Sequence, residues 1–243
     1  MSDYRNRIYK NYLNTCCKSL APDDLESLKP RYYLYNMVIE NYFPVDKNAK
    51  ILDLGCGYGA FVHCVRLAGY SDVIGIDISP QQIEESKRLG IQGVVQSDIL
   101  DFLRSSPDES KDVIITFDVI EHFAKDELII FIDEVYRVLT KRGKWIMHVP
   151  NGESPFFGKV RYGDYTHEVA FTRSSITQLL KCSGFLSIAC GEDMPTVHNL
   201  RSAIHWIMWK FVRFACLFYL LAESGSIEKN SILTQNFIAV AEK

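Results

Sequence analysis

The chain has 243 residues, of which 47% are hydrophobic and 23% are charged, and its formal net charge is −3. This balance is typical of a soluble protein with one sizeable core, and it argues against a nucleic-acid-binding protein that depends on phosphate contacts. The seven cysteines include no CxxC pair, which favours reduced thiols over a disulfide framework or a zinc site. The opening MSDYRNRIYKNYL lacks the apolar core of a signal peptide, so we expect a cytoplasmic protein.

Helical periodicity dominates the first 48 residues, and strand-like and helix-like stretches alternate after them. Apolar residues at three-to-four spacing predict helices over 3–20 and 25–42, so that residues 1–48 form an N-terminal helical segment ahead of a main domain over 49–243. Further helices are expected over residues 59–69, 80–90, 99–106, 124–143 and 172–185. Strands are expected over residues 50–55, 72–79, 93–98, 111–118, 143–150, 185–192 and 235–243.

This alternation predicts an α/β fold with a doubly wound, mostly parallel, seven-stranded sheet of Rossmann-like type. The last strand follows a helical insert over residues 196–226 instead of a standard crossover, so we expect it to pair antiparallel. In such sheets ligands bind outside the carboxyl ends of the strands. The loops after the first five strands are therefore the candidate site, and the longest of them, residues 150–172, is the candidate active-site loop.

The insert contains a nearly apolar stretch, residues 202–222, which is interrupted by His205, Lys210 and Arg213. A spanning helix needs roughly 20 apolar residues with few charges, so this stretch is a poor span. Two interpretations stay open. The stretch is either a helix packed on the core or in a homodimer interface, or an interfacial helix with Trp206 and Trp209 at the level of lipid headgroups.

A knot of glycines follows the first expected strand, in ILDLGCGYGA, residues 51–60. Gly55, Gly57 and Gly59, with Cys56 among them, allow a sharp turn and the close approach of a ligand to the backbone. Alone this pattern is weak evidence, because it also fits a dinucleotide-binding fingerprint or a tight turn without a ligand.

Three aspartates at the ends of the first three strands narrow the choice of ligand. Asp53 precedes the glycines, Asp77 ends the second strand at the distance expected for a carboxylate that binds a ribose diol, and Asp98 ends the third. A phosphate gains nothing from an aspartate in its loop, and no lysine or arginine lies between Lys50 and Arg66. The pattern favours a cationic ligand with a ribose and an adenine over a nucleoside triphosphate.

From about Lys50 to Pro150 the sequence closely resembles the class I S-adenosylmethionine-dependent methyltransferases, through the motifs ILDLGCGYG, VIGIDIS, QSDI, ITFDVIEHF and RVLTKRGKWIMHVPN. The resemblance implies the methyltransferase form of the fold, with S-adenosylmethionine as the cofactor. It implies that residues 55–59 wrap the methionine part and that Asp53 lies near its amino group. The other implied cofactor contacts are Asp77 for the ribose, Ile78, Asp98 and Ile99 for the adenine, and Phe117 and Asp118 for the methionyl end.

Methyl transfer to a hydroxyl also needs a group that takes the proton, and histidine is the natural candidate near neutral pH. His122 follows the fourth strand, and His167 lies in the 150–172 loop together with Asp164 and Glu168. We expect His167 to be the general base, with Asp164 as its orienter and with His122 as a second catalytic candidate; structural roles for both histidines remain open. No dedicated metal-ligand set is evident, although Glu121, His122 and loop acids can be assembled in space.

Beyond the fifth strand the chain is similar to bacterial methyltransferases associated with surface-polysaccharide assembly, through VPNGESPFFGKVRYGDYTHEVAFTRSSITQLLKCSGF and the C-terminal ILTQNFIAVAEK. This resemblance implies a sugar hydroxyl on a glycan or lipid-linked glycan as the acceptor, and the 202–222 stretch would suit peripheral contact with the inner face of the membrane. Two alternatives stay open: a quinone-like or other small hydrophobic acceptor, and a catalytically silent, cofactor-binding scaffold subunit.

Overall fold

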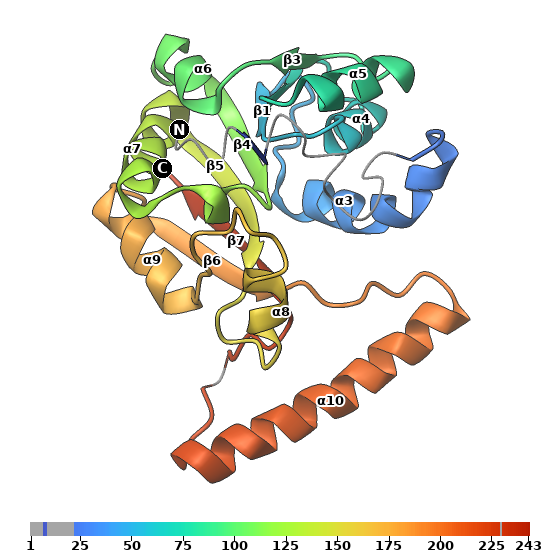
Figure 1. Cartoon of the computed structure of the whole chain (residues 1–243), viewed down its shortest axis with the longest axis vertical. Helices are drawn as coiled ribbons and strands as arrows, with labels where there is room; N and C mark the ends of the chain where they lie inside the picture. The colour runs from blue at the N-terminus through green and yellow to red at the C-terminus, as the bar shows by residue number, and fades with distance from the viewer. Residues whose placement is uncertain (1–6, 9–21, 229) are drawn as a thin grey trace.

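A seven-stranded sheet with strand order β3-β2-β1-β4-β5-β7-β6 forms the centre of the protein (Figure 1). The structure, a computed structural model, describes residues 7–8, 22–228 and 230–243, so the helix expected over residues 3–20 lies almost entirely outside the described residues. The strands are β1 (Ile51–Leu54), β2 (Val73–Asp77), β3 (Val94–Gln96), β4 (Lys111–Phe117), β5 (Leu139–Pro150), β6 (Ser187–Glu192) and β7 (Asn236–Glu242).

The strand pairing confirms the predicted fold class. Strands β1 to β5 pair in parallel, whereas β7 pairs antiparallel with both β5 and β6, as expected for the last strand. The carboxyl ends of β1, β2, β3 and β4 therefore lie at one edge of the sheet, where a ligand is expected.

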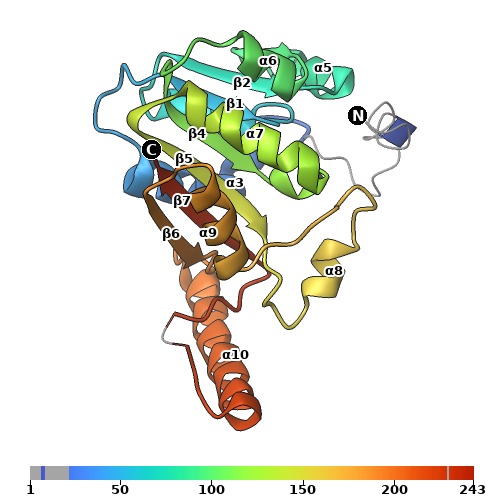
Figure 2. The same ribbon diagram turned by 90° about the vertical axis from the view of Figure 1, so that its left-hand side faces the viewer.

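Helices cover both faces of the sheet (Figure 2). In chain order, the helices are η1 (Glu26–Leu28), α3 (Lys29–Tyr42), α4 (Ala60–Leu67), α5 (Pro80–Arg88), α6 (Ile99–Ser105), η2 (Ile120–His122), α7 (Lys125–Val138), α8 (Phe157–Arg161), α9 (Arg173–Cys182) and α10 (Leu200–Ser224). One apolar layer joins α6, α7 and α9 to the sheet, and a second joins α3 and α4 to the opposite face.

Alternation along β5 decides which side chains each layer receives. Trp145 and Met147 enter the layer of α7 and α9, while Ile146 enters the layer of α3 and α4. Because side chains alternate along a strand, His148 shares the face of Ile146, and its ring lies 5.5 Å from that of Phe117 on β4. The sheet thus turns His148 towards the layer that includes the N-terminal helix α3.

The predicted helix over residues 124–143 is wrong in its last five residues. Helix α7 ends at Val138, and β5 begins at Leu139, four residues before the expected strand. Tertiary hydrogen bonds take over the last helical carbonyls: the Ser110 amide donates to Val138 O at 2.8 Å, and the Lys243 ammonium donates to Leu139 O at 2.8 Å. The sequence after Val138 is compatible with a helix, and these contacts end it.

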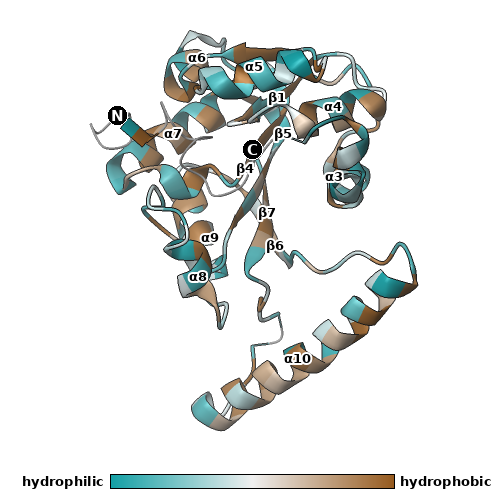
Figure 3. Ribbon diagram, turned by 45° about the vertical axis from the view of Figure 1, so that its right-hand side comes forward, coloured by the Kyte–Doolittle hydropathy of each residue, from teal (hydrophilic) through white to brown (hydrophobic). Residues whose placement is uncertain are grey.

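Helix α10 extends away from the sheet and its flanking helices, between β6 and β7 (Figures 1 and 3). It is the helix among the described residues that is long and apolar enough to cross a membrane by length and composition, and none of its most apolar window is buried. Phe211 and Phe214 are each 72% exposed. The expectation that this stretch packs on the core is therefore wrong, whereas a homodimer interface and membrane contact both stay predictions.

Candidate active site

The glycine loop after β1 has the backbone that its sequence predicts. Gly55, Gly57 and Gly59 have φ of 71°, 56° and 86°, in the left-handed region that side chains other than glycine rarely adopt. A Cβ on Gly55 would lie 2.5 Å from Cγ2 of Val119, which follows β4. The loop therefore brings its backbone directly against the segment after β4.

Asp77, at the end of β2, fixes the glycine loop to the next turn. The Gly57 amide donates to Asp77 Oδ2 and the Ser79 amide donates to Asp77 Oδ1, both at 2.8 Å. Burial raises the pKa of Asp77 above its usual value, against the two amide hydrogen bonds. The carboxylate thus joins β2 to the loop after β1.

A cavity of about 250 Å³ opens between these loops, and fourteen residues line it. They are Gly55, Gly57, Asp77, Ile78, Ser79, Gln82, Asp98, Ile99, Leu100, Asp118, Val119, His122, Phe123 and Glu127. Four of these side chains are carboxylates, and none of the fourteen is lysine or arginine. The cavity is therefore suited to a cationic ligand and unsuited to a phosphate.

The structure places the predicted cofactor residues in two groups. Seven of them line the cavity, namely Gly55, Gly57, Asp77, Ile78, Asp98, Ile99 and Asp118. Asp98 also begins α6, because its Oδ1 accepts from the amides of Leu100 and Asp101 at 2.9 and 3.2 Å. The lining does not include Asp53, Cys56, Gly59 and Phe117.

These four residues support the cavity from behind. Asp53 is 3% exposed, and burial, with the nearby charge of Asp77, raises its pKa well above the usual value. Burial likewise raises the pKa of the Cys56 thiol. Phe117 packs on Phe61 of α4, with ring centroids 5.0 Å apart. Gly59 is the residue from which α4 begins.

His148 forms a charged link that the sequence did not reveal. Its Nδ1 lies 2.7 Å from Asp118 Oδ1, and its Nε2 lies 3.3 Å from Asp193 Oδ2. Burial alone would lower the pKa of His148, but the two carboxylates raise it to about 10. Burial alone would raise the pKa of Asp118, but His148 outweighs it and lowers the pKa. His148 is therefore an imidazolium held between the carboxylates of Asp118 and Asp193.

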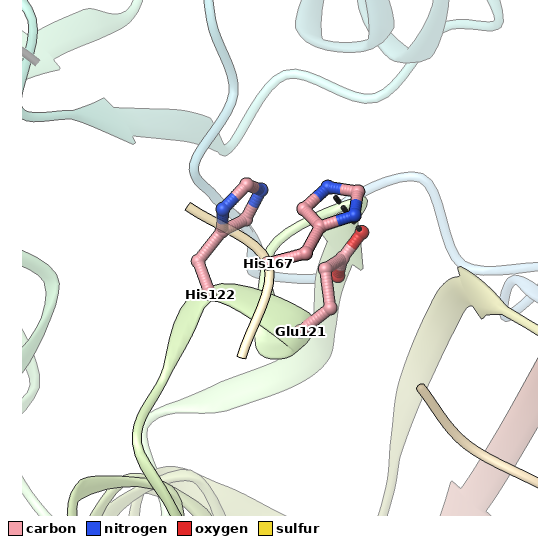
Figure 4. Close-up of side chains that lie close together, drawn as sticks. All are labelled: Glu121, His122 and His167. Atoms are coloured by element: carbon pink, nitrogen blue, oxygen red, sulfur yellow. Dashed lines mark ion pairs between the residues drawn. The ribbon is translucent and has the colours of Figure 1, made fainter. Parts of the chain in front are cut away.

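Glu121, His122 and His167 lie together beside the cavity, as predicted in part (Figure 4). The rings of His122 and His167 are 4.7 Å apart at an interplanar angle of 72°, and His167 Nε2 is 4.0 Å from Glu121 Oε1. His122 lines the cavity, whereas Glu121 is fully buried behind it. We refer to these three residues as the Glu-His-His cluster.

The 150–172 loop reaches this cluster because its base and its tip are both fixed. At the base, Asn151 and Phe171 form a bridge. At the tip, the amide of Glu168 donates to the backbone carbonyl of Glu121 at 2.7 Å. Asp164 supports His122 through Thr166, and not His167 as its expected orienter: Asp164 Oδ1 accepts from the Thr166 hydroxyl at 2.6 Å, and Thr166 Oγ1 lies 2.8 Å from His122 Nδ1.

The fold and the acidic cavity at the strand ends agree with those expected of a class I S-adenosylmethionine-dependent methyltransferase domain. Residues 52–147 match the family model described as "Methyltransferase domain". A solved S-adenosylmethionine-dependent methyltransferase from Archaeoglobus fulgidus superposes with a TM-score of 0.64 at 21% identity, over 90% of this chain and 97% of that chain.

Two curated proteins are similar over the cofactor-binding half. The chain is 33% identical over 102 residues, 40% of its length, to a ubiquinone biosynthesis O-methyltransferase from Pelagibacter ubique. It is 33% identical over 121 residues, 46% of its length, to an ajmaline N-methyltransferase from Rauvolfia serpentina. The matched region spans 40% of each relative. The chain carries a class I S-adenosylmethionine-dependent methyltransferase domain, and S-adenosylmethionine is its cofactor.

The cavity fits this cofactor, which is a sulfonium cation with a ribose and an adenine. Carboxylates of Asp77, Asp98 and Asp118 border the space, and the glycine loop leaves its backbone open to a ligand. Asp77 would hold the ribose hydroxyls, Asp98 and Ile99 the adenine, and the glycine loop with Asp118 the methionyl end. Among the cavity-lining residues no basic side chain competes with the sulfonium.

We expect Asp77→Ala to weaken cofactor binding by roughly 10- to 100-fold, since it removes charge-assisted hydrogen bonds worth about 1.5–3 kcal/mol each and releases the Gly57 amide. Calorimetric titration with the demethylated product, S-adenosylhomocysteine, measures this effect. Asp72→Ala, at the exposed start of the same strand, is the matched control. Equal dissociation constants for wild type and Asp77→Ala would contradict the assignment.

The raised pKa of His148 predicts a stability that depends on pH. Between the ordinary pKa of histidine and about 10, the folded state holds a proton that the unfolded state lacks, so stability falls as pH rises, by up to about 1.4 kcal/mol per pH unit. The stabilisation by protonated His148 is complete at pH values below the ordinary pKa of histidine, and it is lost as the pH rises through about 10. We expect urea unfolding to show that wild type loses about 2 kcal/mol more than His148→Gln between pH 7 and pH 9. Parallel pH profiles would show that His148 is neutral in the folded protein.

Proposed function

We propose that this protein is an O-methyltransferase that moves a methyl group from S-adenosylmethionine to an acceptor hydroxyl. The observation that carries the proposal is the position of the Glu-His-His cluster beside an acidic cofactor cavity, with His122 common to both. The cofactor supplies an electrophilic methyl group. The chain then has to orient the acceptor oxygen in line with that group and to accept the hydroxyl proton.

The hydrogen bonds of the histidines support this role. The Val160 carbonyl can only accept, so His167 Nδ1, 3.0 Å away, carries a proton, and Nε2 is the nitrogen that remains for the acceptor. The Thr166 hydroxyl gives its one proton to Asp164, so His122 Nδ1 donates to Thr166. In both imidazoles Nε2 is thus the nitrogen that can act as a base. Burial and the neighbouring His167 lower the pKa of His122 to about 4, so it stays neutral at physiological pH.

The proposed acceptor is a hydroxyl carried on a lipid, with a lipid-linked glycan as the first candidate. Helix α10 supports a membrane-borne acceptor, because it exposes aromatic and aliphatic side chains along its length and carries Lys210 near Trp206, with the ammonium 4.9 Å from the ring centroid. Arg213 fixes the helix to the end of β6 through Glu192, at 3.1 Å. The sugar itself rests on the resemblance beyond β5.

A quinone-like phenol is the second candidate, favoured by the similarity to the ubiquinone biosynthesis O-methyltransferase. Methyl transfer from labelled cofactor to a panel of lipid-linked glycans, free sugars and prenylated phenols separates the two candidates. Turnover of a phenol alone would replace the glycan. Cofactor binding without turnover of any acceptor, even with candidate partners added, would favour a scaffold subunit.

We expect His167→Ala to lower kcat by roughly 100-fold or more, because it removes a group that handles the acceptor hydroxyl. The affinity for S-adenosylhomocysteine should stay near that of wild type, since His167 does not line the cofactor cavity. His63→Ala, on α4, is the matched histidine control for both measurements. Unchanged kcat in His167→Ala would remove this residue from the mechanism.

The membrane interpretation of α10 predicts binding to phospholipid vesicles. Replacing Phe211, Phe214 and Phe218, which are 72%, 72% and 64% exposed, by serine should lower sedimentation with vesicles of anionic phospholipid by at least about tenfold. Cofactor affinity should not change, because these side chains lie away from the cavity. Val45→Ser, which alters an exposed apolar residue elsewhere, is the control. Equal sedimentation of the triple variant and wild type would leave the homodimer interface as the explanation of α10.

A further inference from the structure

Glu121 is a buried carboxylate without a hydrogen-bond partner. Its side chain is 1% exposed, and neither Oε1 nor Oε2 accepts or donates a hydrogen bond among the described residues. His167 Nε2 lies 4.0 Å from Glu121 Oε1, beyond hydrogen-bond distance. A buried unsatisfied polar group is rare in native proteins and calls for a physical explanation, such as a bound cation.

Two imidazoles face this carboxylate with their geometry already fixed (Figure 4). Histidines that bind a metal through one nitrogen usually donate the other ring N–H to a carbonyl, carboxylate or similar acceptor. His167 donates from Nδ1 to the Val160 carbonyl, and His122 donates from Nδ1 to Thr166, whose hydroxyl is held by Asp164. Both rings therefore have the tautomer and the support that a metal ligand needs.

The three side chains are close enough to share an ion. One nitrogen from each histidine and one carboxylate oxygen all lie within 4.8 Å of one another. Bonds of about 2.0–2.2 Å from a central ion at tetrahedral angles place ligand atoms roughly 3.3–3.6 Å apart, so side-chain rotations would have to draw the most distant atoms together by about 1 Å.

We propose that Glu121, His122 and His167 form a binding site for a divalent transition-metal cation, with further coordination positions open. Two imidazole nitrogens and one carboxylate favour Zn²⁺, Co²⁺, Fe²⁺ or Mn²⁺ over Mg²⁺ and Ca²⁺, which prefer oxygen ligands. The sequence predicted no metal site, because Glu121 and His122 are separated from His167 by 45 or more residues of chain.

The site's place in the reaction rests on the proposed function. His122 lines the cofactor cavity, so the open positions of the cation would lie beside it and would receive the acceptor hydroxyl. With the cation bound, the two histidines would hold it through Nε2 in place of taking the proton themselves. The cation would make the hydroxyl more acidic, and the proton would pass to solvent water. Cation binding itself needs neither the cofactor nor the acceptor.

Co²⁺ is the probe for the site, since its visible absorption reports coordination by protein ligands. We expect the full chain, first treated with a chelator, to bind one Co²⁺ in equilibrium dialysis and to develop this absorption. Glu121→Gln should weaken binding by about tenfold or more, and Thr166→Val, which removes the support of His122, by roughly 10- to 100-fold. His205→Asn, on the exposed helix α10, should bind as wild type does.

Two further measurements keep the outcomes distinct. Thermal unfolding without metal shows whether Glu121→Gln is folded, and added Co²⁺ should raise the Tm of wild type and leave that of Glu121→Gln unchanged. Absence of Co²⁺ binding by wild type, or equal binding by Glu121→Gln, overturns the site. Methyl transfer that continues undiminished after chelation overturns its role in the reaction and leaves the proposed function standing. Co²⁺ binding without methyl transfer to any acceptor supports the site and counts against the proposed function.

Discussion

An excess of negative charge at the carboxyl edge of the sheet is the constraint on which the rest of the structure depends. Half-buried Asp77 and exposed Asp118 border one cavity, and Asp53 and Glu121 are buried behind it, where an uncompensated charge is expensive. The protein supplies one buried cation of its own there, the His148 imidazolium, and commits it to Asp118 and Asp193. The remaining carboxylates use backbone amides, as Asp77 does, or lack a hydrogen-bond partner, as Glu121 does. The cationic cofactor would offset the negative charge of the carboxylates that line the cavity, and a divalent cation would offset that of Glu121.

Local sequence predicted those parts of the site that each lie within one short stretch. The glycine loop, Asp77 and Asp98 are fixed by the strand that precedes them, so the order of strands alone brings them to one edge. The partners of His148 and His122 lie 30 to 45 residues away, in loops whose course depends on the whole fold. Because side chains alternate along a strand, β5 could present His148 on either face of the sheet. The register of the strands decides which face it takes.

The errors of the sequence analysis have the same physical origin. The residues after Val138 favour a helix locally, but amides of the 109–110 turn and the C-terminal lysine take the carbonyls that would continue it. Apolarity over residues 202–222 left packing on the core as one of two interpretations, because apolar helices normally cover a core. Helices α3, α4, α6, α7 and α9 pack on the sheet's faces, and the insert between β6 and β7 extends away from them (Figure 1).

The segment after β4 couples the cofactor cavity to the Glu-His-His cluster. Asp118 has a φ of 56°, which is strained for a residue other than glycine, and its hydrogen bond to His148 holds it there. That turn sends Asp118, Val119 and His122 to the cavity and Glu121 to the interior. Val119 in turn occupies the space that a side chain on Gly55 would need. The absence of a side chain at Gly55 therefore has two effects. It opens the backbone of the glycine loop to the cofactor. It also leaves room for the turn after β4, which places Asp118 and His122 at the cavity.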